Sequence, residues 1–488
     1  MALSEAAVSP FRLRGHGSSG ARWLTARVPG RSNEVRDPVH TFIDFNSLER
    51  EVIDSLPFQR LRHVHQLALS GQVYPGASHK RFEHSLGVMH LAGRIFDVVT
   101  KEEKLSDEVR DLVPKRGEAE FSYWKTVLRV AALCHDIGHL PFSHAGEEDL
   151  LPEDWDHERI TLELIGSGPM AEVWNSVRPS PVPDDVIKLA LGPKKVASLK
   201  LDLSFDDWEG VLAEIITSDA LGADRIDYLL RDSLHTGVAY GRFDHNRLIQ
   251  TMRILPRSPE RDSEDGGDFG EPQLGIERGG LESAEALLLA RYFMFAQVYY
   301  HPTRLIYDEH LKDFLRAWLP DGRFPVEPDG HLSYTDNEVW AAITKAAEDA
   351  GADGHDSARR IAHREHFRVV DERQIAEDVG ERSIAVTAVF EALRERYGAE
   401  SVRFGRSPKR GEAPDFPVMQ RDGKVASSVS LSEVLRQLPV ARDEYVFMPA
   451  DLREDAKKWL KTERDNIVTA AAERVEKESD EEKEDGES

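Results

Sequence analysis

A histidine followed directly by an aspartate, placed at the end of an apolar helical stretch, restricts most strongly how this chain can fold. The segment Cys134-His135-Asp136-Ile137-Gly138-His139 follows three apolar residues, Ala131 to Leu133. Protein cores exclude ionisable side chains unless these are paired or bind a ligand. The two side chains can converge on one ligand only where the helix ends or is distorted, and Gly138 permits such a break. We therefore expect a helical core built around a polar centre.

Two residues far from this segment complete a possible metal site. His84 lies on an earlier expected helix and Asp224 on a later one. Two imidazoles and two carboxylates suit Zn, Fe or Mn, and also Mg where water completes the shell. Such a set leaves positions open for water and a phosphate oxygen, as a catalytic centre requires.

A single His-Asp pair is common by chance, so the residues around it decide the interpretation. Further ionisable residues cluster there, namely His139, His144, Asp156, His157 and Glu158. Asp156 is also a fair helix N-cap, which would make His157 an ordinary residue of a helix start. The cluster as a whole favours a catalytic site.

Composition limits the compartment and the partners. The 488 residues have a net charge of −25, which argues against a protein that coats nucleic acid or an anionic membrane. The only cysteine, Cys134, excludes a disulfide within the chain. No apolar run approaches the ~18 residues of a spanning helix. We expect a cytoplasmic protein without a membrane partner.

Hydrophobic periodicity predicts a mainly α fold. Expected helices cover residues 48–56, 61–69, 83–100, 124–137, 187–191, 211–216, 223–230, 281–300 and 385–397, and residues 303–375 look mostly helical. Residues 252–255 and 273–276 predict a β-hairpin with a long tip. Short strands are expected at 402–404, 416–420 and 425–429, with a turn at Asp422-Gly423.

These elements suggest five parts. They are a basic arm (1–36), a helical domain with a hairpin insertion (37–310, insertion about 252–278), a helical lobe (311–380), a small α+β lobe (381–470) and an acidic tail (471–488).

Eight motifs occur in an order that resembles a known family. They are Asp37–His40, Pro57–Arg62, Tyr74–His79, Arg81–Val88, Leu133–His139, Pro141–His144, Asp156–Glu158 and Ala223–Asp232. Together they resemble the HD superfamily of metal-dependent phosphohydrolases. Within it the chain is most similar to the deoxynucleoside triphosphate triphosphohydrolases, which include the SAM-and-HD-domain dNTPases and bacterial relatives. The match runs from about residue 36 to about 375.

The resemblance implies an HD-domain helical core and hydrolysis of a dNTP to a deoxynucleoside and triphosphate. It implies a divalent metal (Mg, Mn, Fe or Zn) held by His84, His135, Asp136 and Asp224. It also implies a paired catalytic His157 and Glu158, with His139 as a proton donor at the leaving oxygen.

Substrate contacts are implied by the same resemblance. Matches to phosphate contacts are Arg81, His144, Arg225 and Arg291, where Arg225 replaces a lysine of the human member. Matches to sugar or base contacts are Gln66, Leu67, Tyr228, Asp232 and Tyr299. A bulky Leu67 would exclude a 2′-hydroxyl, although core packing explains Leu67 and Tyr299 equally well.

A regulatory site is the last implication. Asp54, Gln59 and Arg62 match an allosteric guanine-nucleotide site that a neighbouring subunit completes, so a nucleotide-activated homo-oligomer, tetramer or dimer, is expected. Surface salt bridges would account for the same three residues.

Two other functions remain open. One is an HD phosphohydrolase acting on a nucleoside monophosphate, an alarmone or a cyclic dinucleotide, although the Gly-Tyr-Pro signature of the last branch is absent near His135. The other is a nucleic-acid-binding HD protein, which the arginine-rich arm favours and the net charge opposes.

Overall fold

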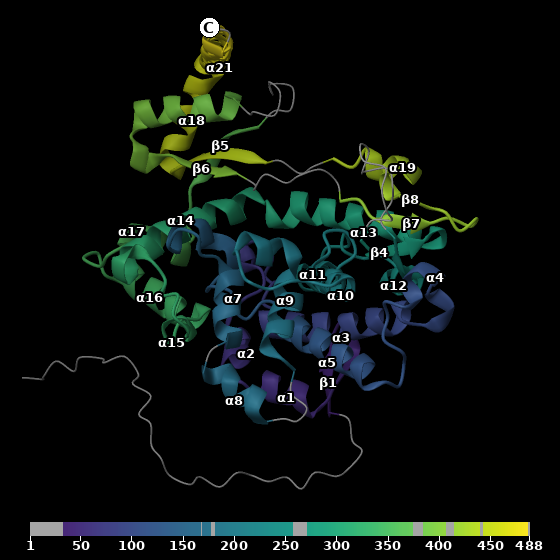
Figure 1. The fold of residues 1–488 in the computed structure, drawn as a ribbon. Coiled ribbons are helices and arrows are strands. Elements are labelled where there is room, and N and C mark those ends of the chain that lie inside the picture. The colour runs from purple at the N-terminus through teal and green to yellow at the C-terminus, as the bar shows by residue number, and fades with distance from the viewer. Residues whose placement is uncertain are drawn as a thin grey trace, which may run out of the picture.

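The computed structural model describes residues 33–166, 168–176, 181–256, 271–373, 384–406, 414–439 and 443–486. Within these ranges the fold is mainly α with three small sheets, which confirms the expected fold class (Figure 1). The expected arm up to residue 32 and the hairpin tip at 257–270 lie outside the described residues. No helix among the described residues has the length and apolar character to cross a membrane.

The first described element is a β-hairpin that begins within the last four residues of the span expected as a basic arm. Strand β1 (Asn33–Asp37) pairs antiparallel with β2 (Thr41–Phe45), with Val35 opposite Ile43. Ile43 is fully buried and Val35 packs against the main core. Ordered backbone therefore begins before residue 37, because this hairpin contributes apolar side chains to the core.

Five helices build the body that carries the polar centre. They are α3 (Arg81–Val99), α5 (Ala119–Cys134), α9 (Pro183–Ser198), α10 (Asp207–Thr217) and α11 (Ala223–Thr236). Helix α3 packs on both α5 and α11. A Cβ on Gly87 of α3 would come within 1.9 Å of the Asp227 carboxylate of α11, so only glycine allows this helix contact.

Shorter helices surround this body in Figure 1. They are α1 (Ser47–Ile53), α2 (Leu56–Arg60), α4 (Asp107–Arg110), α6 (Glu147–Leu150), α7 (His157–Gly166), α8 (Gly168–Ser176) and α12 (His245–Thr251).

The prediction of a helix at residues 61–69 is wrong. The chain there forms two 3-10 turns, η1 (Leu61–His63) and η2 (Ala68–Gln72), joined by an extended stretch. The backbone of this stretch pairs with residues 79–81: Gln66 N donates to His79 O at 3.0 Å, and Arg81 N donates to Val64 O at 3.0 Å. The tertiary pairing outweighs the helical periodicity and brings Gln66 beside His79.

The expected hairpin is confirmed and belongs to a larger sheet. Strands β3 (Met252–Leu255) and β4 (Gln273–Glu277) pair antiparallel. Strand β7 (Pro417–Met419) pairs parallel to β4, and β8 (Val425–Ser427) closes a turn that contains Gly423 at φ 85°. The region after residue 380 thus extends the sheet of the helical domain, and short helices α19 (Ser428–Leu431) and α20 (Glu433–Arg436) follow.

The helical lobe follows α13 (Leu281–Met294), which ends in a π-helical turn, η7 (Phe295–Tyr299). Its helices are α14 (Pro302–Trp318), α15 (Pro328–Leu332), α16 (Asp336–Glu348) and α17 (His355–Ala362). The expected helical character does not continue to residue 375, since Arg368–Glu372 form strand β5 paired with β9.

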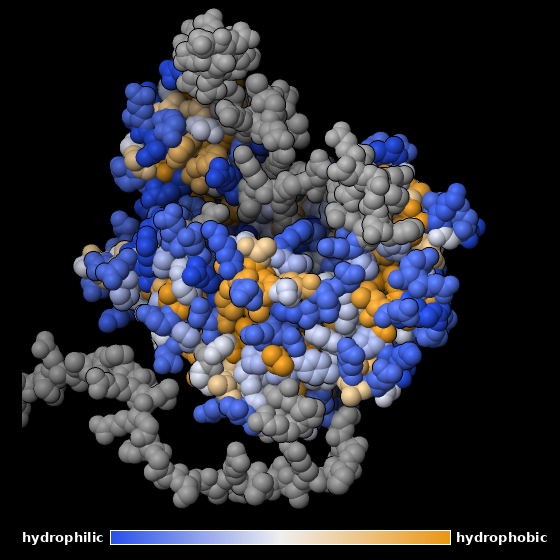
Figure 2. All heavy atoms as spheres, in the orientation of Figure 1, coloured by the Kyte–Doolittle hydropathy of each residue, from blue (hydrophilic) through white to orange (hydrophobic). Residues whose placement is uncertain are grey.

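A second, smaller core lies at the C-terminal end. Strands β5, β9 (Glu444–Met448) and β6 (Arg403–Arg406) form one sheet in the order β5-β9-β6. Helices α18 (Ile384–Tyr397) and α21 (Ala450–Gly486) pack together beside it. Figure 1 shows the end of α21 rising away from the body, and Figure 2 shows mainly hydrophilic side chains on the face it draws.

Candidate active site

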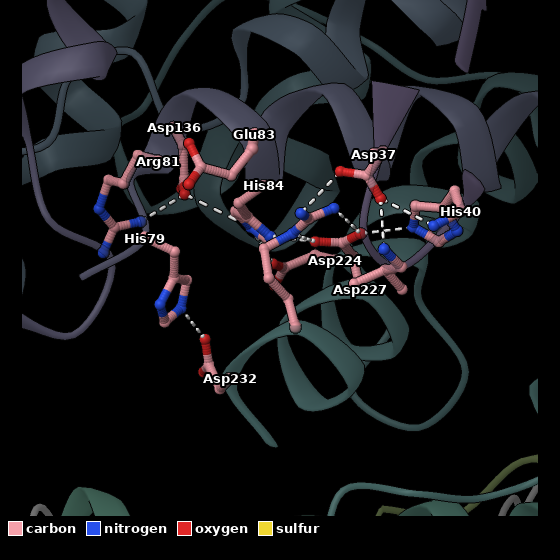
Figure 3. Close-up of polar contacts among 12 residues, drawn as sticks. Asp37, His40, His79, Arg81, Glu83, His84, Asp136, Asp224, Asp227 and Asp232 are labelled. Carbon is pink, nitrogen blue, oxygen red and sulfur yellow. Dashed lines mark hydrogen bonds and ion pairs between the residues drawn. The ribbon is translucent and has the colours of Figure 1, made fainter. Parts of the chain in front are cut away.

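The expected metal ligands lie at three helix ends, and Figure 3 shows His84, Asp136 and Asp224 among them. His84 lies in the first turn of α3, His135 directly follows the last residue of α5, and Asp224 is the second residue of α11. The α5 helix ends at Cys134, so His135 and Asp136 leave the helical path and can both face the same centre.

Ligand atoms of His84, His135 and Asp224 all lie within 4.8 Å of one another, as a metal site requires. Asp224 Oδ1 is 3.1 Å from His84 Nε2 and 3.7 Å from His135 Nε2. Asp136 lies beside this group, with Oδ1 3.4 Å from His135 Nε2 and Oδ2 3.7 Å from His84 Nε2. The structure therefore groups three of the four expected ligands, whereas Asp136 falls in a second possible group with His139 and His157.

The second nitrogen of each imidazole is fixed by the protein. His84 Nδ1 lies 2.9 Å from Asp227 Oδ2, and His135 Nδ1 donates to Ala132 O at 2.9 Å. This is the usual outer contact of a metal-bound histidine, since it leaves the Nε2 lone pair directed at the metal. Among the described residues His135 Nε2 is buried without a hydrogen-bond partner. These residues fit a divalent metal ion.

The charges of the centre also fit a cation. Burial opposes ionisation of Asp136, but His135 and Arg81 outweigh it and hold the pKa of Asp136 well below its usual range. The pKa of Asp224 is likewise lowered, because its contacts with His135 and His84 outweigh burial. Both carboxylates are therefore ionised at neutral pH.

Asp227 is the hub of a buried ion network behind His84. Its carboxylate lies 2.7 Å from His40 Nε2 and accepts from Arg231 at 2.8 and 3.0 Å. Arg231 in turn donates to Asp37 at 2.8 Å, and its side chain is fully buried. Arg231 above all holds the pKa of Asp227 well below its usual value against the effect of burial. The network fixes the orientation of His84.

A stacked pair of imidazoles lies on the other side of Asp136. His139 Nε2 is 3.2 Å from Asp136 Oδ1, and the ring of His139 stacks on His157 at 3.9 Å and 12°. His157 Nδ1 lies 2.6 Å from Glu147 Oε1, which also accepts from His157 N. Burial disfavours the charged form of His157, but Glu147 outweighs it, so the pKa of His157 is raised. Burial together with Arg81 holds the pKa of His139 well below its usual value.

Gly138 permits this stacking. A Cβ at this position would come within 2.2 Å of His157 O and 2.4 Å of Thr161 N. Gly138 N donates to Thr161 Oγ1 at 3.1 Å. The absent side chain therefore lets the start of α7 approach the end of α5.

Glu158, expected beside His157, faces a lysine. Glu158 Oε2 lies 2.8 Å from Lys195 Nζ, and Lys195 also pairs with Asp156. Asp156 additionally accepts from Arg159 N at 2.9 Å, as a helix N-cap does. The carboxylate in contact with His157 is Glu147, which the sequence interpretation did not include.

Arg81 is buried beside the centre. It pairs with Asp136 Oδ2 and donates from Nε to Ser143 Oγ at 2.9 Å. The side chain of His144, the next expected phosphate contact, lies outside the described part of the structure.

Two other expected phosphate contacts meet at one loop. Arg225 donates to Ser218 O at 2.9 Å and pairs with Asp219. Arg291 donates to Asp219 O at 2.9 Å. Both guanidinium groups are thus directed at the loop that precedes α11.

The expected sugar contacts gather around Asp232. Tyr299 OH donates to Asp232 Oδ2 at 2.6 Å, and His79 Nε2 lies 2.7 Å from Asp232 Oδ1. The ring of Tyr228 lies 6.2 Å from that of Tyr299. His79 stacks on His235 at 4.4 Å.

Gln66 and Leu67 lie on the extended stretch that pairs with residues 79–81. Gln66 Oε1 is buried and, among the described residues, has no hydrogen-bond partner. Leu67 is partly buried and packs against the main core.

Of the three expected regulatory residues, Asp54 and Arg62 are exposed and Gln59 is half-buried. Asp54 pairs with Arg50 at 3.3 Å, with both side chains more than half exposed. Arg62 donates to Gln59 Oε1 at 2.8 Å and lies over the Phe82 ring at 3.5 Å.

Comparison with family profiles agrees with this geometry. The HD domain profile matches residues 81–232, and the HD-associated region profile matches residues 243–395. The first range holds all four expected ligands on the three helices described above. The chain contains an HD domain followed by an HD-associated region.

Curated relatives of this HD protein match part of their own length. The chain is 34% identical over 288 residues to an uncharacterized protein of Methanocaldococcus jannaschii, covering 57% of this chain and 48% of that protein. It is 34% identical over 238 residues to the deoxynucleoside triphosphate triphosphohydrolase SAMHD1 of Bos taurus, covering 45% and 38%. The chain spans about half the length of such relatives, or less.

Solved structures extend the similarity of the HD protein along most of the chain. A hypothetical protein from Aquifex aeolicus is 29% identical with a TM-score of 0.69, covering 88% of this chain and 100% of that one. A phosphohydrolase from Bacteroides thetaiotaomicron, 24% identical with a TM-score of 0.62, covers 86% and 100% and supports the fold alone.

Several residues near the HD centre were given no role in the sequence interpretation. They are His79, Ser143, Glu147, Lys195 and Asp227. Asp227 had a usable signal, because it lies three residues after the expected ligand Asp224 and so shares its face of the helix. Glu147 had none, since its contact with His157 depends on how the loop before α7 folds.

Proposed function

We propose that this HD protein is a metal-dependent deoxynucleoside triphosphate triphosphohydrolase that converts a dNTP and water to a deoxynucleoside and triphosphate. The observation that carries the proposal is the grouping of His84, His135 and Asp224, with Asp136 lying between this group, Arg81 and the His139–His157 pair. The name of the bovine relative gives the substrate class, and Asp232 with Tyr299 supplies a contact for a sugar hydroxyl.

The metal would be held by the two Nε2 atoms and the two carboxylates. When bound, it supplies Lewis-acid polarisation of a phosphate oxygen and acidifies a water molecule. Asp227 and the Ala132 carbonyl keep both imidazoles in the tautomer that such binding needs.

The chain's own cations would bind the triphosphate. Arg81 is fixed between Ser143 and Asp136, so its guanidinium is oriented before substrate binds. Arg225 and Arg291 extend the positive charge toward the loop before α11. Arginine suits this task, because its planar fork forms paired hydrogen bonds with phosphate oxygens.

The reaction breaks the bond between the α-phosphorus and the 5′-oxygen of the sugar. Water supplies the oxygen that joins the phosphorus, and the 5′-oxygen must gain a proton as it leaves. His157, whose pKa Glu147 raises, would be a source of that proton, and the stacked His139 contacts Asp136. Glu158 remains part of the proposal as a second carboxylate next to His157.

Sugar recognition would use the group around Asp232. Asp232 and Tyr299 would hold the 3′-hydroxyl, while Gln66, Leu67 and Tyr228 would lie against the ring. Leu67 would select against a 2′-hydroxyl, because the added oxygen needs space and a polar partner.

A nucleotide-activated homo-oligomer is the regulatory part of the proposal. Asp54 and Arg62 are exposed, and Arg62 contacts the half-buried Gln59, which suits a site that a neighbouring subunit completes. Activity that appears only in mixtures of dNTPs, and that Arg62→Ala removes, would support it.

The test is a product analysis. Purified protein is incubated with each dNTP and Mn²⁺ or Mg²⁺, singly and mixed, and products are resolved by ion exchange beside an Asp136→Ala control. Deoxynucleoside plus intact triphosphate, lost in the control, supports the proposal. Orthophosphate or pyrophosphate would contradict it. No turnover would redirect the assay to nucleoside monophosphates and alarmones.

A further inference from the structure

The turn that follows His135 and Asp136, here called the HD pair, contains two successive residues whose backbone has a left-handed conformation. Phe142 has φ 58° and Ser143 has φ 59°. Residues other than glycine rarely adopt this conformation, which persists only where the surrounding structure holds it. Phe142 is also fully buried, so water does not satisfy its backbone. Some other part of the molecule must hold this turn.

That part is Asp336, the first residue of α16 in the HD-associated region. Asp336 is fully buried, and its Oδ1 accepts from Phe142 N at 2.7 Å. Its Oδ2 lies 2.8 Å from His65 N and 2.5 Å from His65 Nδ1. One helical turn later, Trp340 packs edge-on against the Phe142 ring at 5.8 Å. Asp336 therefore ties together two segments from outside its own lobe.

Both segments lead to Arg81. Ser143 Oγ donates to His65 O at 2.9 Å, and Arg81 Nε donates to the same Ser143 Oγ at 2.9 Å. Arg81 then pairs with Asp136 of the HD pair. A continuous set of hydrogen bonds thus runs from Asp336 to the centre.

A second contact joins the same lobe to the same turn. The buried Arg60 donates from Nε to Tyr334 O at 2.9 Å and from NH1 to His139 O at 2.8 Å. Arg60, which contacts Tyr334 just before α16, therefore holds the backbone at His139. Asp336, the first residue of α16, holds the backbone at Phe142.

A helix-capping role does not account for Asp336. Thr335 is the N-cap of α16, and a capping box with Glu338 already satisfies the first turn. The Asp336 carboxylate is instead bonded to His65 through Oδ2 and to Phe142 through Oδ1.

We propose that Asp336 is a positioning residue through which the HD-associated region orients Arg81 in the active site. It holds Phe142 and Ser143 in the left-handed turn and holds His65 behind Ser143, and Ser143 orients the guanidinium. The proposal rests on the proposed function in one respect, the role of Arg81 as a phosphate ligand.

The first test needs no substrate. Amide hydrogen exchange is measured in wild type, Asp336→Asn and Thr335→Ala. Asparagine keeps the shape of aspartate, but its NH₂ group would face an N–H donor that contacts a carboxylate oxygen in the wild type. Thr335→Ala is the matched control, because it weakens the start of the same helix and leaves the Asp336 contacts intact. We expect faster exchange at residues 139–146 in Asp336→Asn alone. Equal exchange in both variants would overturn the proposal.

The second test reads the effect on Arg81. Asp336→Asn should lower kcat by about tenfold or more with unchanged metal content, since misplaced catalytic groups cost this much. Combined with Arg81→Lys, which cannot form the Ser143 contact in the same way, it should change kcat by less than about twofold, because coupled residues are not additive. An equal loss in both backgrounds, or an equal loss in Thr335→Ala, would overturn the proposal.

The two tests separate this inference from the proposed function. If wild type releases no triphosphate from any dNTP, the proposed function fails. The exchange comparison then still decides whether Asp336 holds the turn, because it depends on no reaction.

Discussion

Asp227 holds His84 by its Nδ1 nitrogen, at 2.9 Å, from the helix that also carries Asp224. One helix therefore supplies both an expected ligand and the group that orients another. Asp227 is itself held by Arg231 and His40. The orientation of His84 is built into the packing of α11 on α3.

Asp227→Asn should weaken metal binding by about 10- to 100-fold, as loss of such outer contacts does elsewhere. The amide cannot match the carboxylate as an acceptor for His84 Nδ1. Competition with a fluorescent chelator measures the change. The control is Asp37→Asn, which removes a partner of Arg231 without touching His84. Equal loss in both variants would mean that general stability, and not the His84 contact, determines affinity.

Removal of the metal should destabilise the fold. A ligand bound at one hundred times its Kd stabilises the native state by about 2.7 kcal/mol. Thermal unfolding with chelator should therefore occur at a lower Tm than unfolding with Mn²⁺. The His135→Ala variant should show no such difference, because His135 Nε2 faces the centre. An unchanged metal response in His135→Ala would place the metal elsewhere.

Glu147→Gln should lower kcat by about 10- to 100-fold, within the range of acid–base catalysis. Glu147 is the charge that raises the pKa of His157 against burial. Without it that pKa falls, so the pH limb that reports loss of the His157 proton should move to lower pH. Glu158→Gln, which loses a contact with Lys195, should change kcat by less than about threefold. A reversed order would identify Glu158 as the working partner of His157.

Stability should fall as the pH drops below about 6.5, in part because of His331. Burial, and then Arg60, hold the pKa of His331 well below its ordinary value of 6.5. The unfolded chain binds this proton first, so at pH 5.5 the native state loses about 1.4 kcal/mol from one such group. Denaturant unfolding at pH 7.5 and 5.5 should show a smaller difference in His331→Gln. The exposed His363→Gln should retain the wild-type difference.

Local patterns were sufficient to predict the helices that carry the metal ligands. Helices α3, α5 and α11 occur close to where apolar periodicity places them, although α5 ends at Cys134 and not at the expected residue 137, and the β3–β4 hairpin pairs as expected. The helix expected at 61–69 failed, because backbone pairing with residues 79–81 depends on a contact that periodicity does not encode. The prediction that residues 368–372 are helical failed for a related reason, since strand β5 forms there by pairing with β9, more than 70 residues away.

The candidate site also contains a part that the sequence predicts and a part that only the folded chain reveals. Its expected ligands stand in short motifs, and the structure brings them together at the ends of three helices. Glu147, His79 and Asp336 act through contacts between loops and lobes, so only the folded chain reveals them. The residue types in the motifs predict which side chains could bind a metal. The packing of the folded chain determines which other side chains orient these ligands.

Because Gly138 has no side chain, the backbone that follows the HD pair lies very close to the first turn of α7. A Cβ at this position would not fit between the two segments. This close approach leaves little room to move His157 relative to Asp136. If the proposed function holds, divergence toward new substrates would therefore be expected around Asp232 and Tyr299, while the groups around His157 keep their geometry.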